Sequence, residues 1–105
     1  MGRFDGRGAI VTGGALGIGG GCARRIAADG GSVLIVDVNE SAGANTVKEI
    51  RAAGGKAEFM AGDVSKQSTA EEMVESAVSS FGRLDLLVQN AYAGADNAGS
   101  AVEVE

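Results

Sequence analysis

Residues 8–19 read GAIVTGGALGIG, an apolar run followed directly by closely spaced glycines. The run Ala9–Val11 predicts a buried strand over Gly8–Thr12, and the apolar residues Ile18, Cys22 and Ile26 recur at the four-residue spacing of a helix. Glycines between a strand and a helix permit a tight turn and a close approach of the backbone to a ligand. The stretch therefore predicts a strand, a glycine turn, and a helix whose N-terminus suits an anion such as a pyrophosphate.

The same alternation of apolar runs and helical periods continues along the chain. Further strands are expected at Val33–Val36, Ala57–Ala61 and Leu84–Val88, and near-continuous apolar runs of this kind suit parallel strands covered on both faces. One helix expected between them runs from about Glu40 to Ala53, and another carries an apolar stripe from Met73 to Phe81. The pattern predicts an α/β fold, a Rossmann-like doubly wound parallel sheet, incomplete, with about four strands alternating with helices.

Two local expectations follow from this pattern. Thr69 and Glu72 have the spacing of a capping box, which would place the start of the third helix there, and Gly82 is expected to end it. The stretch Ala91–Ala101 is rich in Ala, Gly and Asn and is expected to be a loop. The strand Leu84–Val88 would then form an edge of the sheet, through which the isolated chain would associate.

The composition bounds the possible functions. A chain of 105 residues is expected to be one domain, 1–105. With no His and one Cys, imidazole chemistry, an intrachain disulfide and a multi-cysteine zinc site are excluded, and no metal site is expected. A net charge of −5 and 4% aromatic residues do not suit a nucleic-acid partner. Because no run is long enough for a membrane span or a secretion signal, a cytoplasmic protein without membrane association is expected.

Polar residues follow the predicted strands, where doubly wound sheets bind their ligands. Asp37 could accept hydrogen bonds from both hydroxyls of an adenosine ribose and would repel a 2′-phosphate; alternatively, it only starts a turn and caps the next helix. Asp63, in Gly62-Asp63-Val64, could reach an adenine amino group, or belong to a simple turn. Asn90 follows the fourth strand, where the middle of a dinucleotide would lie.

These motifs together resemble the short-chain dehydrogenase/reductase family. The resemblance is carried by TGxxxGIG at residues 12–19, Gly62-Asp63-Val64 and LVQNA at residues 87–91, and it covers the chain from Gly6 to about Glu105. It implies an oxidoreductase that transfers a hydride between a nicotinamide cofactor and an alcohol or ketone, with NAD preferred over NADP because of Asp37. The residues that it assigns to the cofactor are Gly13, Ala15, Leu16, Gly17, Ile18, Gly19, Asp37, Asp63, Val64 and Asn90.

The sequence departs from the family pattern in two places. The family's Asn-Asn-Ala-Gly motif has Gln89 and Tyr92 at its first and last positions here. The resemblance places the catalytic Ser and Tyr-x-x-x-Lys of the family beyond Glu105. Nothing in these residues replaces the Tyr–Lys pair, because Tyr92 is the single tyrosine and Asp96 stands where the lysine would be. We therefore expect no catalytic residue in this chain, which would be the amino-terminal, dinucleotide-binding part of an enzyme truncated relative to the family. The complete enzyme is expected to be a homo-oligomer.

Three other interpretations remain at this point. The chain could be a non-catalytic dinucleotide-binding module, complete as written, or an inactive fragment. It could also be an S-adenosylmethionine-dependent methyltransferase, since such enzymes use a glycine turn and an acidic residue after the second strand as well. The spacing of the glycines and the Asp63 motif argue against the methyltransferase.

Overall fold

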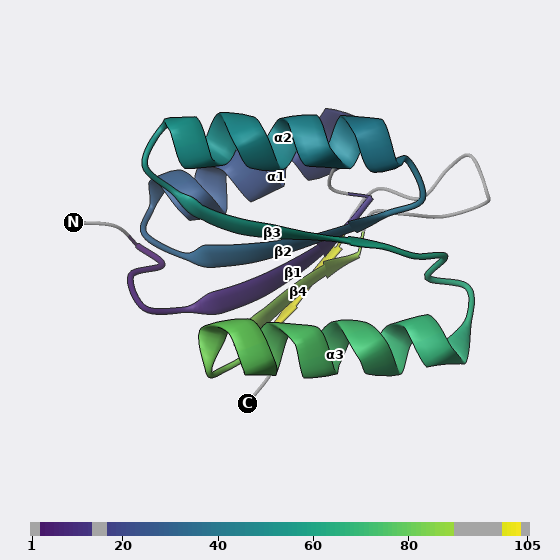
Figure 1. Cartoon of the computed structure of the whole chain (residues 1–105). Coiled ribbons are helices and arrows are strands. Elements are labelled where there is room, and N and C mark those ends of the chain that lie inside the picture. Colours follow the sequence, from purple (N-terminus) through teal and green to yellow (C-terminus); the bar gives the residue numbers. More distant parts are fainter. Residues whose placement is uncertain (1–2, 14–16, 90–99, 104–105) are drawn as a thin grey trace.

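The computed structural model describes residues 3–13, 17–89 and 100–103, which form a sheet between two layers of helices (Figure 1). Helices α1 and α2 cover one face of the sheet, and α3 covers the other (Figure 1). The elements, in chain order, are β1 (Gly8–Thr12), α1 (Gly17–Ala28), β2 (Ser32–Asp37), α2 (Glu40–Ala52), β3 (Lys56–Ala61), α3 (Gln67–Phe81), β4 (Leu86–Gln89) and β5 (Ser100–Glu103).

The strand order is β3-β2-β1-β4-β5, with the first four strands parallel and β5 antiparallel to β4. The chain winds outward from β1 through β2 to β3 and then crosses back to place β4 on the other side of β1. This reversal confirms the predicted doubly wound, Rossmann-like fold. Its switch point lies between β1 and β4, so the carboxyl ends of these strands border the crevice where such folds bind ligands.

The prediction that the fourth strand lies at the sheet edge is wrong. β4 pairs with β1 on one side and with β5 on the other, from Leu86↔Glu103 to Gln89↔Ser100. Strand β5 includes Ser100 and Ala101, the last two residues of the stretch Ala91–Ala101 that the composition assigned to a loop, and residues 91–99 lie outside the described residues. The sequence did not indicate this strand, because Ser-Ala-Val-Glu contains a single strong β-former. With β4 paired on both sides, the expected association through its edge has no basis.

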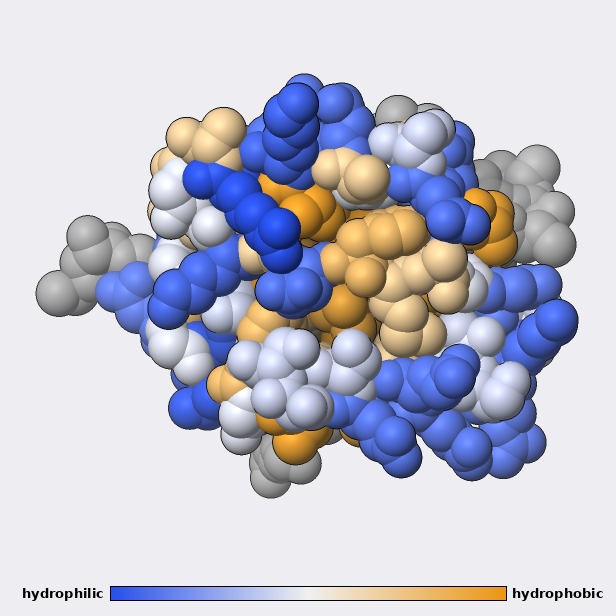
Figure 2. All heavy atoms as spheres, viewed as in Figure 1, coloured by the Kyte–Doolittle hydropathy of each residue, from blue (hydrophilic) through white to orange (hydrophobic). Residues whose placement is uncertain are grey.

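The outer strand on the other side is β3. Figure 2 looks onto this edge and shows apolar side chains between α2 and α3, flanked by hydrophilic ones. Lys56 and Glu58 are exposed on the strand, and Glu58 forms an ion pair with Arg51 of α2 at 3.1 Å. Charged side chains along an edge strand disfavour pairing with another chain.

The core consists of two layers divided by the sheet. Alternation along β1 directs Ala9 and Val11 toward α1 and α2, and Ile10 toward Met73 and Ala77 of α3. All of β1 and the run Val33–Val36 of β2 are buried, as near-continuous apolar strands predict. Cys22 packs against the α1–α2 side of the core, which agrees with its place in the helical stripe.

The ends of α2 and α3 agree with the sequence-based expectation except at the start of α3. Asn39 caps α2, its side chain accepting a hydrogen bond from the Ala42 N–H at 3.1 Å. The predicted capping box is wrong, because α3 already begins at Gln67 and Thr69 is a buried residue inside it. Gly82 ends α3 as predicted, in the left-handed conformation (φ 80°), and its N–H donates to the Val78 carbonyl.

Asp85 joins the start of β4 to the start of β1. Its N–H donates to the Gly8 carbonyl at 2.8 Å, and its Oδ2 accepts from the Gly8 N–H at 2.9 Å. Arg83 donates to both carboxylate oxygens, at 2.6 and 2.5 Å. Since the carboxylate takes the place of a strand carbonyl, regular pairing begins only at Leu86, later than the sequence predicted.

The first prediction concerns the pH dependence of this link. Hydrogen bonds from Arg83, and then from the Gly8 N–H, lower the pKa of Asp85 below its usual value of 3.8. A lowered folded-state pKa stabilises the fold above the unfolded pKa, and this contribution is lost as the pH falls through the folded pKa. We therefore expect Asp85→Asn to lower the urea midpoint at pH 7 and to flatten its fall below about pH 4.

Asp29→Asn is the matched control for this measurement. The Asp29 carboxylate pairs with the exposed Arg25 side chain, at 3.1 Å, and exposed pairs of this kind contribute little to stability. The urea midpoint of Asp29→Asn should equal that of the unmodified chain at every pH. If Asp85→Asn did the same, the link between β1 and β4 would contribute nothing to stability.

The second prediction compares two glycines. A Cβ at Gly8 would overlap the Arg83 backbone carbonyl, whereas a Cβ at the exposed Gly21 of α1 would meet nothing within 4 Å. Gly8→Ala should therefore lower the free energy of unfolding by about 1–3 kcal/mol. Gly21→Ala should raise it by about 0.5–1 kcal/mol, because alanine favours a helix interior. Urea unfolding checks both values, and equal effects would contradict the close approach at Gly8.

Candidate functional site

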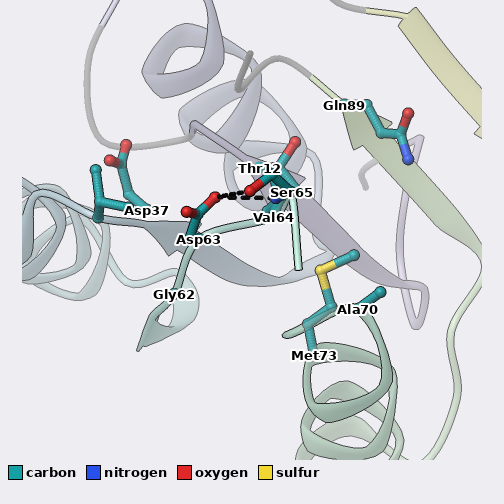
Figure 3. Close-up of a pocket in the computed structure, with 10 residues that line it drawn as sticks. Thr12, Asp37, Gly62, Asp63, Val64, Ser65, Ala70, Met73 and Gln89 are labelled. Atoms are coloured by element: carbon teal, nitrogen blue, oxygen red, sulfur yellow. Dashed lines mark hydrogen bonds between the residues drawn. The ribbon is translucent and has the colours of Figure 1, made fainter. Parts of the chain in front are cut away.

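A cavity of about 560 Å³ lies where β1, β2, β3 and β4 end, and its size is typical of a small-molecule site (Figure 3). The loop after β3 and the first half of α3 form the remaining wall. The cavity therefore lies at the carboxyl edge of the sheet that the topology indicated. Its lining residues are Thr12, Asp37, Val38, Gly62, Asp63, Val64, Ser65, Ala70, Met73 and Gln89.

The glycine turn lies between β1 and α1. Gly13 (φ 66°) and Gly17 (φ 61°) adopt positive φ values that favour glycine, and the Gly13 N–H donates to the Val36 carbonyl of β2 at 2.8 Å. Gly19 is buried in the first turn of α1, which also contains Ile18 and has no acidic residue. The positive end of the helix dipole is thus left for an anion at this edge. Ala15 and Leu16 lie outside the described residues.

Asp37 is the last residue of β2 and lines the cavity. Its Oδ1 accepts a hydrogen bond from the Asn39 N–H at 3.0 Å, and Asn39, not Asp37, caps α2. Asp37 therefore has a local role in the turn while its carboxylate borders the cavity. The next residue, Val38, is 70% exposed, so a flat apolar group entering the cavity could cover it.

Asp63 and Val64 follow β3 and line the same cavity. Asp63 Oδ1 accepts two hydrogen bonds from Ser65, from its hydroxyl at 2.7 Å and from its N–H at 2.9 Å. These bonds lower the pKa of Asp63 below its usual value, with a smaller contribution from the charge of Lys66. Figure 3 shows the carboxylates of Asp37 and Asp63 on the same side of the site.

Thr12 and Met73 also line the cavity, although the sequence did not assign either side chain to the site. Thr12 ends β1, and its hydroxyl donates to the Val88 carbonyl of β4 at 3.3 Å, which holds the two strand ends together. Met73 was assigned to the apolar stripe of α3, but it lies in the half of the helix next to the carboxyl ends of the strands. A helix that follows a strand begins at this edge, so the topology could have placed Met73 here.

The predicted residues are thus only partly brought together. Asp37, Asp63 and Val64 line one cavity, while the glycines form the turn beside it. Gln89, a departure from the family motif, also lines the cavity. Asn90 and Tyr92 lie outside the described residues.

Within residues 3–13, 17–89 and 100–103, no helix is long and apolar enough to cross a membrane. No group of three or more His, Cys, Asp or Glu side chains that could hold a metal ion occurs among these residues.

The sequence matches the family model for short chain dehydrogenases over residues 7–104, so the chain belongs to the short chain dehydrogenase family. This agrees with the resemblance carried by its motifs and excludes the methyltransferase interpretation.

Individual relatives are similar over most of the chain. An uncharacterized oxidoreductase of Methylorubrum extorquens is 46% identical over 86% of the chain and 37% of its own length. A diacetyl reductase [(S)-acetoin forming] of Staphylococcus epidermidis is 45% identical over 79% of the chain and 32% of its own length. A 3beta-hydroxysteroid dehydrogenase of Mediterraneibacter gnavus is 42% identical over 87% of the chain and 33% of its own length. The chain thus spans about a third of the length of these relatives.

Solved structures share the fold. A hydroxysteroid dehydrogenase from Escherichia coli superposes with a TM-score of 0.84 at 36% identity, over 89% of this chain and 40% of that one. A short chain dehydrogenase/reductase from Burkholderia phymatum, solved in complex with NAD, superposes with a TM-score of 0.78 at 36% identity, over 83% of this chain and 31% of that one. The fold therefore occurs in a relative that binds a nicotinamide dinucleotide.

Proposed function

We propose that residues 1–105 are the NAD-binding part of a short-chain oxidoreductase that transfers a hydride between the cofactor and an alcohol or ketone. The observation that carries the proposal is the cavity at the switch point of the sheet, bordered by the carboxylates of Asp37 and Asp63. The family match and the relative solved with NAD support a nicotinamide dinucleotide as its ligand.

The described residues fit the adenosine half of such a cofactor. Asp37, at the end of β2, would accept hydrogen bonds from the ribose hydroxyls, and Asp63 from the adenine amino group. Val38 and Val64 supply apolar surface for the base. The first-turn N–H groups of α1 after Gly17 would face the pyrophosphate. Ala15, Leu16, Ile18 and Asn90 are assigned to the cofactor by the family resemblance alone.

The chain's own contribution is to bind and orient the cofactor. When bound, the nicotinamide accepts or donates the hydride. The names of the relatives, a diacetyl reductase and a 3beta-hydroxysteroid dehydrogenase, support a carbonyl or alcohol substrate for the complete enzyme. We further propose that the complete enzyme is a homo-oligomer.

Thermal unfolding with added dinucleotide tests the proposal. NAD at about 100 times its Kd should stabilise the chain by about 2.7 kcal/mol, which raises the Tm by about 12 °C in a domain of this size. Nicotinamide mononucleotide, which lacks the adenosine half, is the matched control and should raise the Tm much less. The same Tm with and without saturating NAD would contradict the proposal.

A further inference from the structure

The Asp63 carboxylate is held from one side only. Both donors of Ser65, the hydroxyl at 2.7 Å and the N–H at 2.9 Å, bind the same oxygen, Oδ1. Among the described residues, no hydrogen bond ends on the second oxygen, Oδ2. Figure 3 shows Oδ1 turned toward Ser65 and the other oxygen turned toward the side of the site where Asp37 lies.

We propose that Ser65 is a positioning residue that turns Asp63 Oδ2 toward the base of the bound nucleotide, so that the site selects adenine over hypoxanthine. This inference rests on the proposed function, because it assumes that a nicotinamide dinucleotide occupies the cavity. It adds to that function the residue that fixes the base-reading carboxylate and the kind of base that the site rejects.

The selection follows from which atom donates the hydrogen bond. Adenine carries an amino group at its sixth position, which donates to a carboxylate oxygen, whereas hypoxanthine carries a carbonyl oxygen there, which only accepts. If Asp63 Oδ2 faced the carbonyl oxygen of hypoxanthine, neither acceptor would have a hydrogen-bond donor and the two oxygens would repel each other. A fixed Oδ2 would therefore disfavour hypoxanthine. A carboxylate that rotates freely would lose part of this selectivity, because it could turn away from the carbonyl.

The charge of the carboxylate supports the same role. Because the hydrogen bonds from Ser65 lower its pKa, Asp63 remains ionised and acts only as an acceptor at neutral pH. Val38 and Val64 line the same cavity and can pack against the faces of the base while the carboxylate reads its edge.

Titration of the 105-residue chain with NAD and with nicotinamide hypoxanthine dinucleotide tests this inference. The unmodified chain should bind NAD tighter by about tenfold, the effect of one hydrogen bond to a charged group. Ser65→Ala should reduce this ratio to about threefold or less, since only the backbone donor remains. Ser65→Thr keeps the hydroxyl and should keep the ratio. Ser68→Ala, at an exposed serine in the first turn of α3, is the control for serine removal and should also keep it.

Asp63→Asn provides an independent measurement. Both Ser65 donors require an acceptor, so they should bind the carbonyl oxygen of the new amide and turn its NH₂ toward the base. The preference should then reverse, with the hypoxanthine dinucleotide bound about threefold or more tighter than NAD. A role for Ser65 in the stability of the turn alone does not predict this reversal.

The outcomes separate the two proposals. If the unmodified chain binds NAD and the ratio is unchanged in Ser65→Ala, the role of Ser65 is overturned and the proposed function stands. The role of Ser65 is equally overturned if the unmodified chain binds both dinucleotides with the same affinity. If it binds neither, the proposed function itself fails, and the role of Ser65 fails with it.

Discussion

Replacing Asp37 with alanine is expected to lower the affinity of the chain for NAD by about 10-fold or more and to raise its affinity for NADP. The carboxylate lies at the end of β2, on the border of the cavity, where a ribose would meet it. Each hydrogen bond from a ribose hydroxyl to a charged acceptor contributes about 1.5–3 kcal/mol, and alanine removes them. The 2′-phosphate of NADP would face a carboxylate of like sign in the unmodified chain and none in the variant.

Two variants separate the charge of Asp37 from its role in the turn. Asp37→Asn keeps an acceptor for the Asn39 N–H but removes the charge, so it should relieve the rejection of NADP while preserving the turn. Asn39→Ala removes the cap of α2 and should lower stability by about 1 kcal/mol without changing the NAD to NADP ratio. Calorimetric titration with each cofactor measures the ratio. If it is the same in Asp37→Ala and the unmodified chain, Asp37 is only a turn residue.

The second large expected effect is the complete absence of hydride transfer by the 105-residue chain, even when NAD is bound. The family resemblance implies that a Tyr-x-x-x-Lys pair carries the proton transfer that accompanies hydride transfer. In this chain the single tyrosine, Tyr92, is followed four residues later by Asp96. No histidine is present to replace it. This chain should therefore bind the cofactor without catalysing hydride transfer.

Absorbance of NADH measures the turnover, as its formation from saturating NAD with small alcohols and as its consumption with small ketones. The control is the same mixture without protein, and a Tyr92→Phe variant should behave like the unmodified chain. Hydride transfer above the control would show that another group in these residues moves the proton. Its loss in Tyr92→Phe would then identify Tyr92 as that group.

The sequence predicted the parts of the fold that depend on local patterns. Buried parallel strands require continuous apolar runs, which is why β1 was predicted with its observed ends and β2 with one residue missing at each end. Strand β5 was missed because its four residues are ordered by pairing with β4, and the sequence of the strand does not show this pairing. The start of β4 was placed too early, because the Gly8 N–H donates to the Asp85 side chain and not to a backbone carbonyl of β4.

The candidate site was predictable where a residue follows a strand directly. Asp37 and Asp63 lie just past β2 and β3, so position along the chain was enough to place both in the cavity. Met73 and Ser65 were missed for different reasons. Met73 fits an ordinary core stripe, and only the direction of α3 brings it to the cavity. The role of Ser65 depends on which carboxylate oxygen it binds, and this geometry cannot be read from residue order.

The link between Gly8 and Asp85 also bears on the order in which the chain assembles. β1 and β2 are joined by a single helix, whereas the bond from Gly8 to Asp85 closes a loop of 77 residues. Each doubling of loop length adds about 0.6 kcal/mol of closure entropy, so pairing β1 with β4 costs about 1 kcal/mol more than pairing β1 with β2. During synthesis, the central strand β1 can therefore pair with β2 early, but its edge toward β4 stays unpaired until almost the whole of this chain has been made.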